Sequence, residues 1–151
     1  MYSDLKQDII DAIEDINDLL ISYELLFTRV EQREPDNIEL AAMATVLHSF
    51  YNGIESIFLL VSKQIDKETP NDSTWHQSLL NQMITETKER ACLISPDTAS
   101  ILASYMKFRH FFRHAYAFML DWRHLKPLVD DLNSVWNTVR EDFVLFVDSL
   151  S

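Results

Sequence analysis

The segment Lys107–Tyr116 concentrates the side chains of this 151-residue chain that best suit chemistry on an anion. It contains two arginines, Arg109 and Arg113, and two histidines, His110 and His114. A histidine that titrates near neutral pH can remove and return protons, and the planar fork of an arginine can hold two phosphoryl oxygens. The combination therefore predicts a site that acts on a phosphate group.

Cleavage of RNA is the reaction that this set of side chains suits best. RNA carries its own nucleophile, the 2′-hydroxyl. The protein need only take the proton from that hydroxyl, stabilise the charge on the phosphoryl oxygens and protonate the leaving oxygen. No step requires a metal ion or another cofactor, and we expect none.

Helical geometry limits which of these side chains can meet. On an ideal helix Arg109, Arg113 and Tyr116 lie within about 60° of one another, and Tyr116 lies about 20° from Arg109. His114 lies roughly 140° from Arg109 on the same helix. Arg109 and His114 can converge only if the helix is distorted, or if two copies of the motif meet across a symmetry axis.

The charge of the chain is strongly uneven. The net charge is −11, from 13 Lys and Arg against 24 Asp and Glu. No acidic residue occurs from Thr98 to Leu120, and residues 107–126, the basic segment, hold five basic side chains against Asp121 alone. That segment carries about +4 and the rest of the chain −15, which predicts a focused anion site on a protein otherwise unsuited to nucleic acid.

Each of these features has a plainer interpretation. The basic side chains could pair with acidic neighbours such as those of the first helix, and Tyr116 could simply pack. Four phenylalanines at helical spacing could belong to the core: Phe108, Phe111, Phe112 and Phe118. The i,i+4 pair His110 and His114 could bind a metal, with a third ligand from Asp121, His124 or Cys92.

Composition excludes several classes of protein. One Gly and four Pro are too few for a fold rich in hairpins, and one Cys excludes an intrachain disulfide. The start, Met1–Asp4, has no basic stretch followed by an apolar one, so we expect no signal peptide. The longest unbroken apolar run, Ala115–Leu120, is far shorter than the roughly 20 residues of a membrane span. We expect a cytoplasmic protein with no membrane contact.

Apolar periodicity and turn signals predict five helices in one all-α domain, residues 1–151, folded as an antiparallel bundle. A stripe from Leu5 to Val30 predicts the first, and the second runs from about Asp36 or Asn37 to about Asp66. Gly53, in its middle, indicates close approach of a neighbouring helix. The remaining helices are expected at about residues 74–90, from Ser95 and Pro96 to about residue 120, and at about residues 127–150.

Three blocks of the sequence carry a resemblance to a known family. Leu47–Glu55 and Trp75–Leu80 resemble the second-helix and third-helix signatures of HEPN-domain ribonuclease toxins of the HepT-like family. Phe108–Tyr116, which contains the pattern Arg-x4-His-x-Tyr, and Leu120–Trp122 resemble its most characteristic block. The pattern alone is weak, but these blocks in order on predicted helices are specific. The resemblance covers nearly the whole chain and is weaker before residue 40 and after residue 126.

The resemblance implies a helical HEPN-like homodimer whose two motifs face one cleft. It implies the toxin of a type II/VII-like toxin–antitoxin pair, a metal-independent endoribonuclease that cleaves tRNA or mRNA and so blocks translation. Arg109 and His114 would be the catalytic pair, with Lys107, His110 and Arg113 binding RNA phosphates. The antitoxin would be a minimal nucleotidyltransferase (MNT) that acts by binding the toxin, by transferring AMP to Tyr116, or by both.

The principal alternative is a non-catalytic helical protein that only binds a nucleotidyltransferase, with the basic segment as its docking surface. The two interpretations differ at one residue, because an adaptor has no need of a histidine at position 114.

Overall fold

The computed structural model describes residues 1–150 and contains, within them, six α-helices and no strand. The helices are α1 (Ser3–Ser22), α2 (Glu24–Gln32), α3 (Asn37–Val61), α4 (Trp75–Met83), α5 (Pro96–His114) and α6 (Trp122–Ser149). A short π-helix, η1 (Ser62–Asp66), follows α3, and a short 3-10 helix, η2 (Ala117–Met119), lies between α5 and α6. The predicted all-α class is therefore confirmed.

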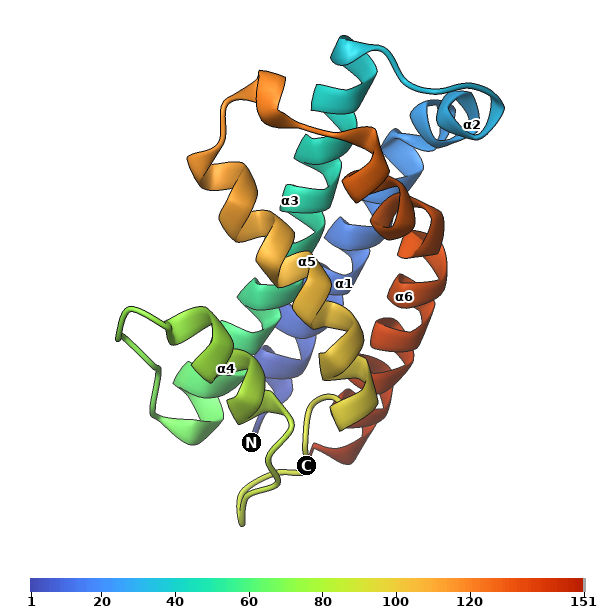
Figure 1. The fold of residues 1–151 in the computed structure, drawn as a ribbon. Helices are drawn as coiled ribbons and strands as arrows, with labels where there is room; N and C mark the ends of the chain where they lie inside the picture. The colour runs from blue at the N-terminus through green and yellow to red at the C-terminus, as the bar shows by residue number, and fades with distance from the viewer. Residues whose placement is uncertain (151) are drawn as a thin grey trace.

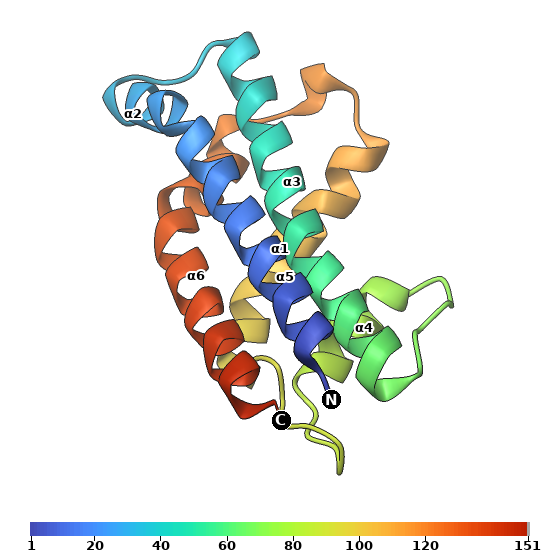
Figure 2. The same ribbon diagram turned by 180° about the vertical axis from the view of Figure 1, so that it is seen from behind.

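Four helices form an up-and-down bundle, and α3 is the central helix of the four. α1, α3, α5 and α6 alternate in direction, and α3 contacts each of the other five α-helices (Figures 1 and 2). The segment between α5 and α6 crosses one end of the bundle, and both chain termini lie at the opposite end. The predicted antiparallel bundle is thus confirmed, with the basic segment at one end of it.

The central position of α3 explains its composition. With η1 it forms one continuous helix, Asn37–Asp66, which by length and composition alone would suffice to cross a membrane. Its large apolar residues Leu47, Phe50, Ile54 and Phe58 are instead completely buried by the surrounding helices. The high hydropathy of α3 therefore reflects its position at the centre of the core.

Local signals set the starts of α3 and α5 as predicted. The Asp36 carboxylate accepts from the Glu39 backbone N–H, and the Glu39 side chain accepts from the Asp36 N–H, which forms a capping box. The Ser95 hydroxyl accepts from the Thr98 N–H, and Pro96 occupies the first turn of α5.

The predicted close approach at Gly53 is also confirmed. A Cβ atom at this position would lie 2.8 Å from Cγ1 of Ile16 in α1. Only a glycine lets α1 and α3 pack this closely at that point.

The first predicted helix is in fact two. α1 ends at Ser22, and the chain bends at Tyr23 before α2 begins. The Ser22 hydroxyl donates to the Asp18 carbonyl, a contact that commonly bends helices. The apolar stripe from Leu5 to Val30 continues across the bend, which is why periodicity alone missed it.

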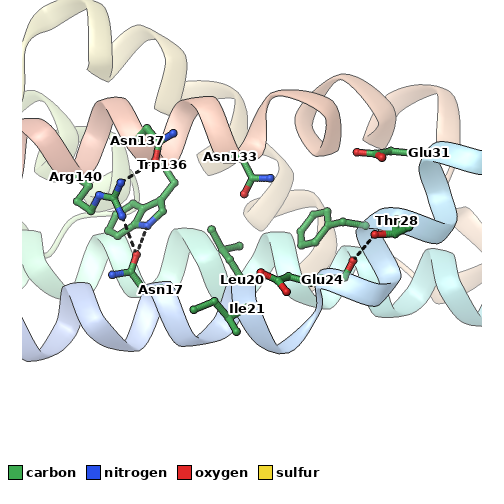
Figure 3. Close-up of a pocket in the computed structure, with 11 residues that line it drawn as sticks. Asn17, Leu20, Ile21, Glu24, Thr28, Glu31, Asn133, Trp136, Asn137 and Arg140 are labelled. Carbon is green, nitrogen blue, oxygen red and sulfur yellow. Dashed lines mark hydrogen bonds between the residues drawn. The ribbon is translucent and has the colours of Figure 1, made fainter.

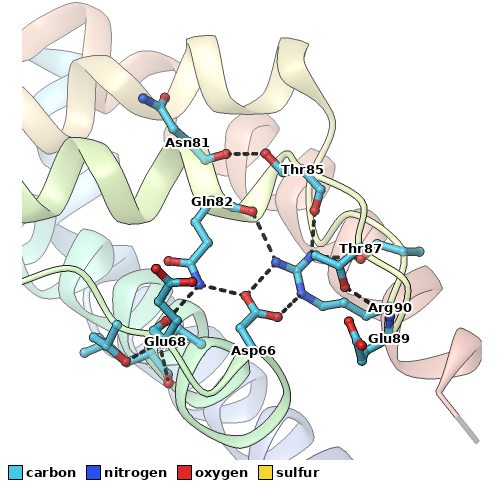
Figure 4. Close-up of polar contacts among 12 residues, drawn as sticks. Asp66, Glu68, Asn81, Gln82, Thr85, Thr87, Glu89 and Arg90 are labelled. Atoms are coloured by element: carbon cyan, nitrogen blue, oxygen red, sulfur yellow. Dashed lines mark hydrogen bonds and ion pairs between the residues drawn. The ribbon is translucent and has the colours of Figure 1, made fainter.

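Helix α4 ends at Met83, seven residues earlier than the predicted end at Arg90. The Arg90 side chain is completely buried and pairs with Asp66 through two hydrogen bonds of 2.7 and 2.8 Å (Figure 4). It also donates to main-chain carbonyls at and beyond the end of α4, those of Gln82 and Thr85. This pair closes the loop after α4 against the end of η1.

Helices α5 and α6 also differ from their predicted bounds. α5 ends at His114 instead of about residue 120, because Ala115 and Tyr116 adopt extended conformations. α6 begins at Trp122, where the Asp121 carboxylate accepts from the Arg123 N–H. Pro127 therefore lies inside α6 and not at its start, at the cost of one helical hydrogen bond.

A polar contact joins α1 to α6. The side-chain Oδ1 of Asn17 in α1 accepts from Trp136 Nε1 at 2.7 Å and from Arg140 Nη1 at 3.4 Å, both in α6 (Figure 3). This contact lines a groove of about 590 Å³ between α1, α2 and α6.

Candidate active site

The α5 part of the basic segment presents cations that have no carboxylate partner. Within residues 1–150, Lys107, Arg109 and Arg113 form no ion pair. Beyond α5 the segment is neutralised locally, because Arg123 pairs with Asp121 at 3.0 Å and Lys126 pairs with Asp130. The expectation of pairing with acidic neighbours thus holds only for the α6 part, and the positive charge of α5 remains available to an anion.

Arg109 is held against the core by two side chains from other helices. Its Nε–H donates to the Asn52 Oδ1 atom of α3, and its Nη1 lies 3.4 Å from Nε2 of His76 in α4. Arg113, one turn further along, is exposed and makes no side-chain hydrogen bond within residues 1–150. The two arginines of the motif therefore differ sharply in how firmly they are fixed.

His76 links Arg109 to a buried carboxylate. Its Nδ1 lies 2.7 Å from Oε2 of Glu55, whose side chain is 5% exposed. The indole of Trp75 packs on the imidazole, with ring centroids 3.6 Å apart and ring planes tilted by 31°. The orientation of the imidazole is thus set by a hydrogen bond at one nitrogen and by an aromatic plane.

His48 extends this cluster along α3. Its Nε2 lies 3.0 Å from Nδ2 of Asn52, and its ring packs on Phe112. Burial lowers the pKa of His48, and the positive charges of Arg109 and Arg113 lower that pKa further. His48 is therefore a neutral hydrogen-bonding partner at pH 7.

A buried tyrosine completes this face of α3. The Tyr51 hydroxyl and the His48 Nδ1 atom are buried without a hydrogen-bond partner within residues 1–150. Burial raises the pKa of Tyr51, and the nearby Glu55 carboxylate raises it further. Tyr51 is thus a neutral phenol beneath the basic end of α5.

His114 and His110 lie outside this cluster. Both are exposed on the last turn of α5, with their ring centroids 4.8 Å apart. α5 is a regular helix through His114, so the angle of about 140° between Arg109 and His114 is retained. Within one chain, no hydrogen bond joins His114 to Arg109.

The expected position of Tyr116 relative to Arg109 is wrong. Tyr116 follows the end of α5 in an extended conformation, so the angle of about 20° derived for a continuous helix does not apply. Its side chain is 71% exposed and stacks on Phe118, with ring centroids 5.6 Å apart. The phenol therefore lies at the surface near the end of α5 and is not packed in the core.

The four phenylalanines of the basic segment divide between core and surface. Phe108 is buried and Phe112 packs against the core, as predicted. Phe111 and Phe118 are 45% and 81% exposed, so their assignment to the core is wrong. Phe118 lies beyond the end of α5, where helical spacing no longer predicts burial.

The metal-binding interpretation receives no third ligand. Among residues 1–150, no three His, Cys, Asp or Glu side chains lie close enough together to hold a metal ion. Asp121 pairs instead with Arg123 and lies 3.9 Å from His124.

The residues that position Arg109 did not stand out as a site in the sequence. In the sequence, His48, Asn52 and Glu55 belong to one family block and His76 to another. Their signal was a polar stripe at i, i+4 and i+7 on the most apolar helix of the chain. A stripe of that kind, partly buried at His48 and Asn52 and fully buried at Glu55, requires polar partners from other helices, and Arg109 and His76 provide them.

An all-α bundle with an Arg-x4-His-x-Tyr pattern that begins on the last turns of one helix is consistent with a HEPN-like protein. A family model described as HepT-like protein matches residues 42–150. The chain therefore belongs to the HepT-like family, whose members are toxin-type HEPN proteins. No curated protein and no solved structure matches the chain.

Proposed function

We propose that this protein is a metal-independent endoribonuclease toxin that cleaves tRNA or mRNA in the cytoplasm and so blocks translation. The observation that carries the proposal is the state of Arg109. Its guanidinium is fixed by Asn52, has no carboxylate partner among residues 1–150 and lies on the same helix as the exposed His114. A fixed, uncompensated arginine is suited to stabilise charge that develops on a phosphoryl group.

In the proposed reaction each side chain has one task. Arg109 binds the non-bridging oxygens of the scissile phosphate, and His114 transfers protons to or from the 2′-hydroxyl and the leaving oxygen. Lys107, His110 and Arg113 bind neighbouring phosphates of the RNA backbone. Because Arg109 and His114 point apart on one helix, we propose that two chains form a homodimer in which each motif completes the other.

Variants of the two catalytic residues test the proposal. Arg109→Ala should lose roughly 3–4 kcal/mol of transition-state stabilisation, as when one oxyanion donor is removed. His114→Ala should lose about 10²–10⁴-fold in rate. Cleavage should survive EDTA and leave 2′,3′-cyclic phosphate ends. The measurements are cleavage of labelled RNA in vitro and growth of cells that express each variant.

The exposed Lys63 provides a control, because it lies in η1, outside the basic segment. Lys63→Ala should cleave RNA and arrest growth as the parent does. Full toxicity and parental cleavage by a folded Arg109→Ala or His114→Ala variant would contradict the assignment. That result would favour the alternative, a non-catalytic partner of a nucleotidyltransferase.

Control of the toxin is assigned to a cognate MNT nucleotidyltransferase that transfers AMP to Tyr116. The exposed phenol of Tyr116, close in sequence to His114, is accessible to such an enzyme. An AMP group there would bring a negatively charged phosphodiester and a bulky nucleoside to the surface where RNA is proposed to bind. Substrate would be excluded by both volume and charge.

Co-expression with the nucleotidyltransferase and peptide mass spectrometry test this assignment. We expect one or more AMP units on the Tyr116 peptide, loss of cleavage by the modified protein and no modification of Tyr116→Phe. Tyr23→Phe, at another exposed tyrosine, should be modified normally. AMP found only at other residues, or neutralisation of a toxic Tyr116→Phe variant, would remove Tyr116 as the switch.

A further inference from the structure

We infer that Arg109 heads a one-directional hydrogen-bond chain in which Asn52 and His76 are positioning residues and Glu55 is the buried anchor. The inference rests on the proposed function for its catalytic consequence and on contacts alone for its structural part. Arg109 meets Asn52 on α3 and His76 on α4, and His76 meets Glu55.

The direction of every bond follows from the chemistry of arginine. A guanidinium has only N–H donors, so Asn52 must turn its oxygen and His76 its unprotonated Nε2 toward Arg109. The Asn52 amide nitrogen then faces Nε2 of His48 at 3.0 Å and donates to it. Both histidines are therefore neutral and carry their proton on Nδ1.

At His76 that proton has a clear acceptor. Nδ1–H donates to the Glu55 carboxylate at 2.7 Å. A doubly protonated His76 would direct a second N–H at the guanidinium, where it would find a donor and a like charge. The buried carboxylate of Glu55 thus acts on the Arg109 guanidinium through a neutral imidazole.

The hydrogen-bond chain also determines which N–H donors of Arg109 remain for a ligand. Of its five N–H donors, Nε–H is used by Asn52 and one Nη1–H by His76. The remaining donors, including both on Nη2, have no partner within residues 1–150. They form the edge that a phosphate oxygen would meet, and their direction is fixed because two contacts on two helices hold the guanidinium plane.

Imidazole NMR tests the structural part without any RNA. In ¹⁵N-labelled protein, long-range ¹H–¹⁵N correlations report which ring nitrogen carries the proton, and His48→Gln and His76→Gln variants assign the signals. At neutral pH we expect His48 and His76 as Nδ1–H tautomers, the minor form of free histidine. Protonation of His76 at Nε2, alone or together with Nδ1, would overturn the inference.

Kinetics test the positioning role. His76→Phe keeps an aromatic ring packed on Trp75 but loses both hydrogen bonds, so kcat should fall about 10- to 100-fold with little change in KM. His76→Gln keeps one donor and one acceptor and should recover kcat to within about threefold of the parent. In an Arg109→Ala background, His76→Phe should cost nothing further, because it acts through Arg109.

Asn17 provides a matched control for Asn52. Each asparagine accepts from an arginine on another helix, but Asn17 lies in the groove between α1 and α6 (Figure 3). Asn52→Ala and Asn17→Ala should lower Tm comparably, and only Asn52→Ala should lower kcat. Parental kcat in folded His76→Phe and Asn52→Ala, or an undiminished effect of His76→Phe without Arg109, would overturn the positioning role.

The two proposals fail in different ways. A parent chain that cleaves no RNA but shows both Nδ1–H tautomers would remove the ribonuclease assignment and support the hydrogen-bond chain. Cleavage that depends on Arg109, together with an Nε2–H tautomer at His76, would support the ribonuclease assignment and contradict the proposed hydrogen-bond chain.

Discussion

Two arginines of the same motif, four residues apart, occupy opposite environments. Arg109 is half-buried and bonded to two neighbouring helices, whereas Arg113 is exposed and has no side-chain partner among the described residues. Residue type alone gives them equal chemistry. Their surroundings give Arg109 a fixed direction and leave Arg113 as an exposed charge that no neighbouring side chain orients among residues 1–150.

This difference predicts unequal tolerance of lysine. Arg109→Lys keeps the charge but lacks the planar fork, so it cannot satisfy Asn52 and His76 and still present donors to a phosphate. Its cleavage rate should fall by about two orders of magnitude. Arg113→Lys keeps the one property that Arg113 is proposed to use and should stay within about threefold of the parent. RNA cleavage at matched protein concentration measures both, and equal losses would show that Arg109 acts by charge alone.

At the scale of the helices, the helix ends that depend on nearby residues were predictable from the sequence. The caps at Asp36 and Ser95 are set by side chains three residues from the groups they bind. Gly53 likewise indicated a helix contact from the sequence alone. The end of α4 was not predictable, because it depends on Arg90 pairing with Asp66, 24 residues earlier in the chain.

The candidate site divides in the same way. Charge along the sequence was enough to predict the basic segment, and the resemblance to the HepT-like pattern singled out Arg109, His114 and Tyr116, but helical spacing placed Tyr116 wrongly. The partners of Arg109 come from two other helices, and only the packing of those helices brings His76 to the face of α3 that carries Asn52 and Glu55. The end of α5 at His114 also required the structure, because the apolar run that follows is compatible with continued helix.

The Asp66–Arg90 pair should govern acid stability. Burial alone would raise the pKa of Asp66, but hydrogen bonds from Arg90 and Gln82 and the charge of Arg90 outweigh it and hold this pKa below its usual value. A carboxylate with a lowered folded-state pKa stabilises the protein above its unfolded pKa of about 4. That contribution is lost as the pH falls through the folded-state pKa.

Asp66→Asn should therefore be costly at neutral pH and less costly in acid. It leaves the fully buried Arg90 without its counter-charge, which should lower the free energy of unfolding by about 3–5 kcal/mol at pH 7. Urea denaturation from neutral pH to below the usual Asp pKa should show the difference from the parent narrowing. Asp15→Asn, at an exposed aspartate, should show little difference at any pH. A pH-independent loss for Asp66→Asn would contradict the ionic origin.

At the scale of the whole molecule, an acidic chain carries a local cluster of cations at one end of the bundle. The net charge is −11, yet the α5 part of the basic segment is free of acidic residues and ion pairs within the described structure. Two such ends facing each other would double the local positive field, and their RNA affinity would fall with added salt. The same arrangement would bring the His114 of one chain toward the Arg109 of the other.

Mixed dimers separate a site shared between two chains from a site within one. A chain with Arg109→Ala keeps His114, and a chain with His114→Ala keeps Arg109. If each site takes its arginine from one chain and its histidine from the other, the mixed dimer contains one intact site and one doubly defective site.

Random exchange of equal amounts should then restore about a quarter of the parental rate, since half of the dimers are mixed and each has one working site. If both residues act within one chain, every site in the mixture lacks one of them and no activity returns. The measurement is RNA cleavage after the two inactive variants are unfolded together and refolded, with each variant refolded alone as the control. Light scattering on the same samples establishes the dimer, and a monomeric mass with parental activity would exclude the shared site.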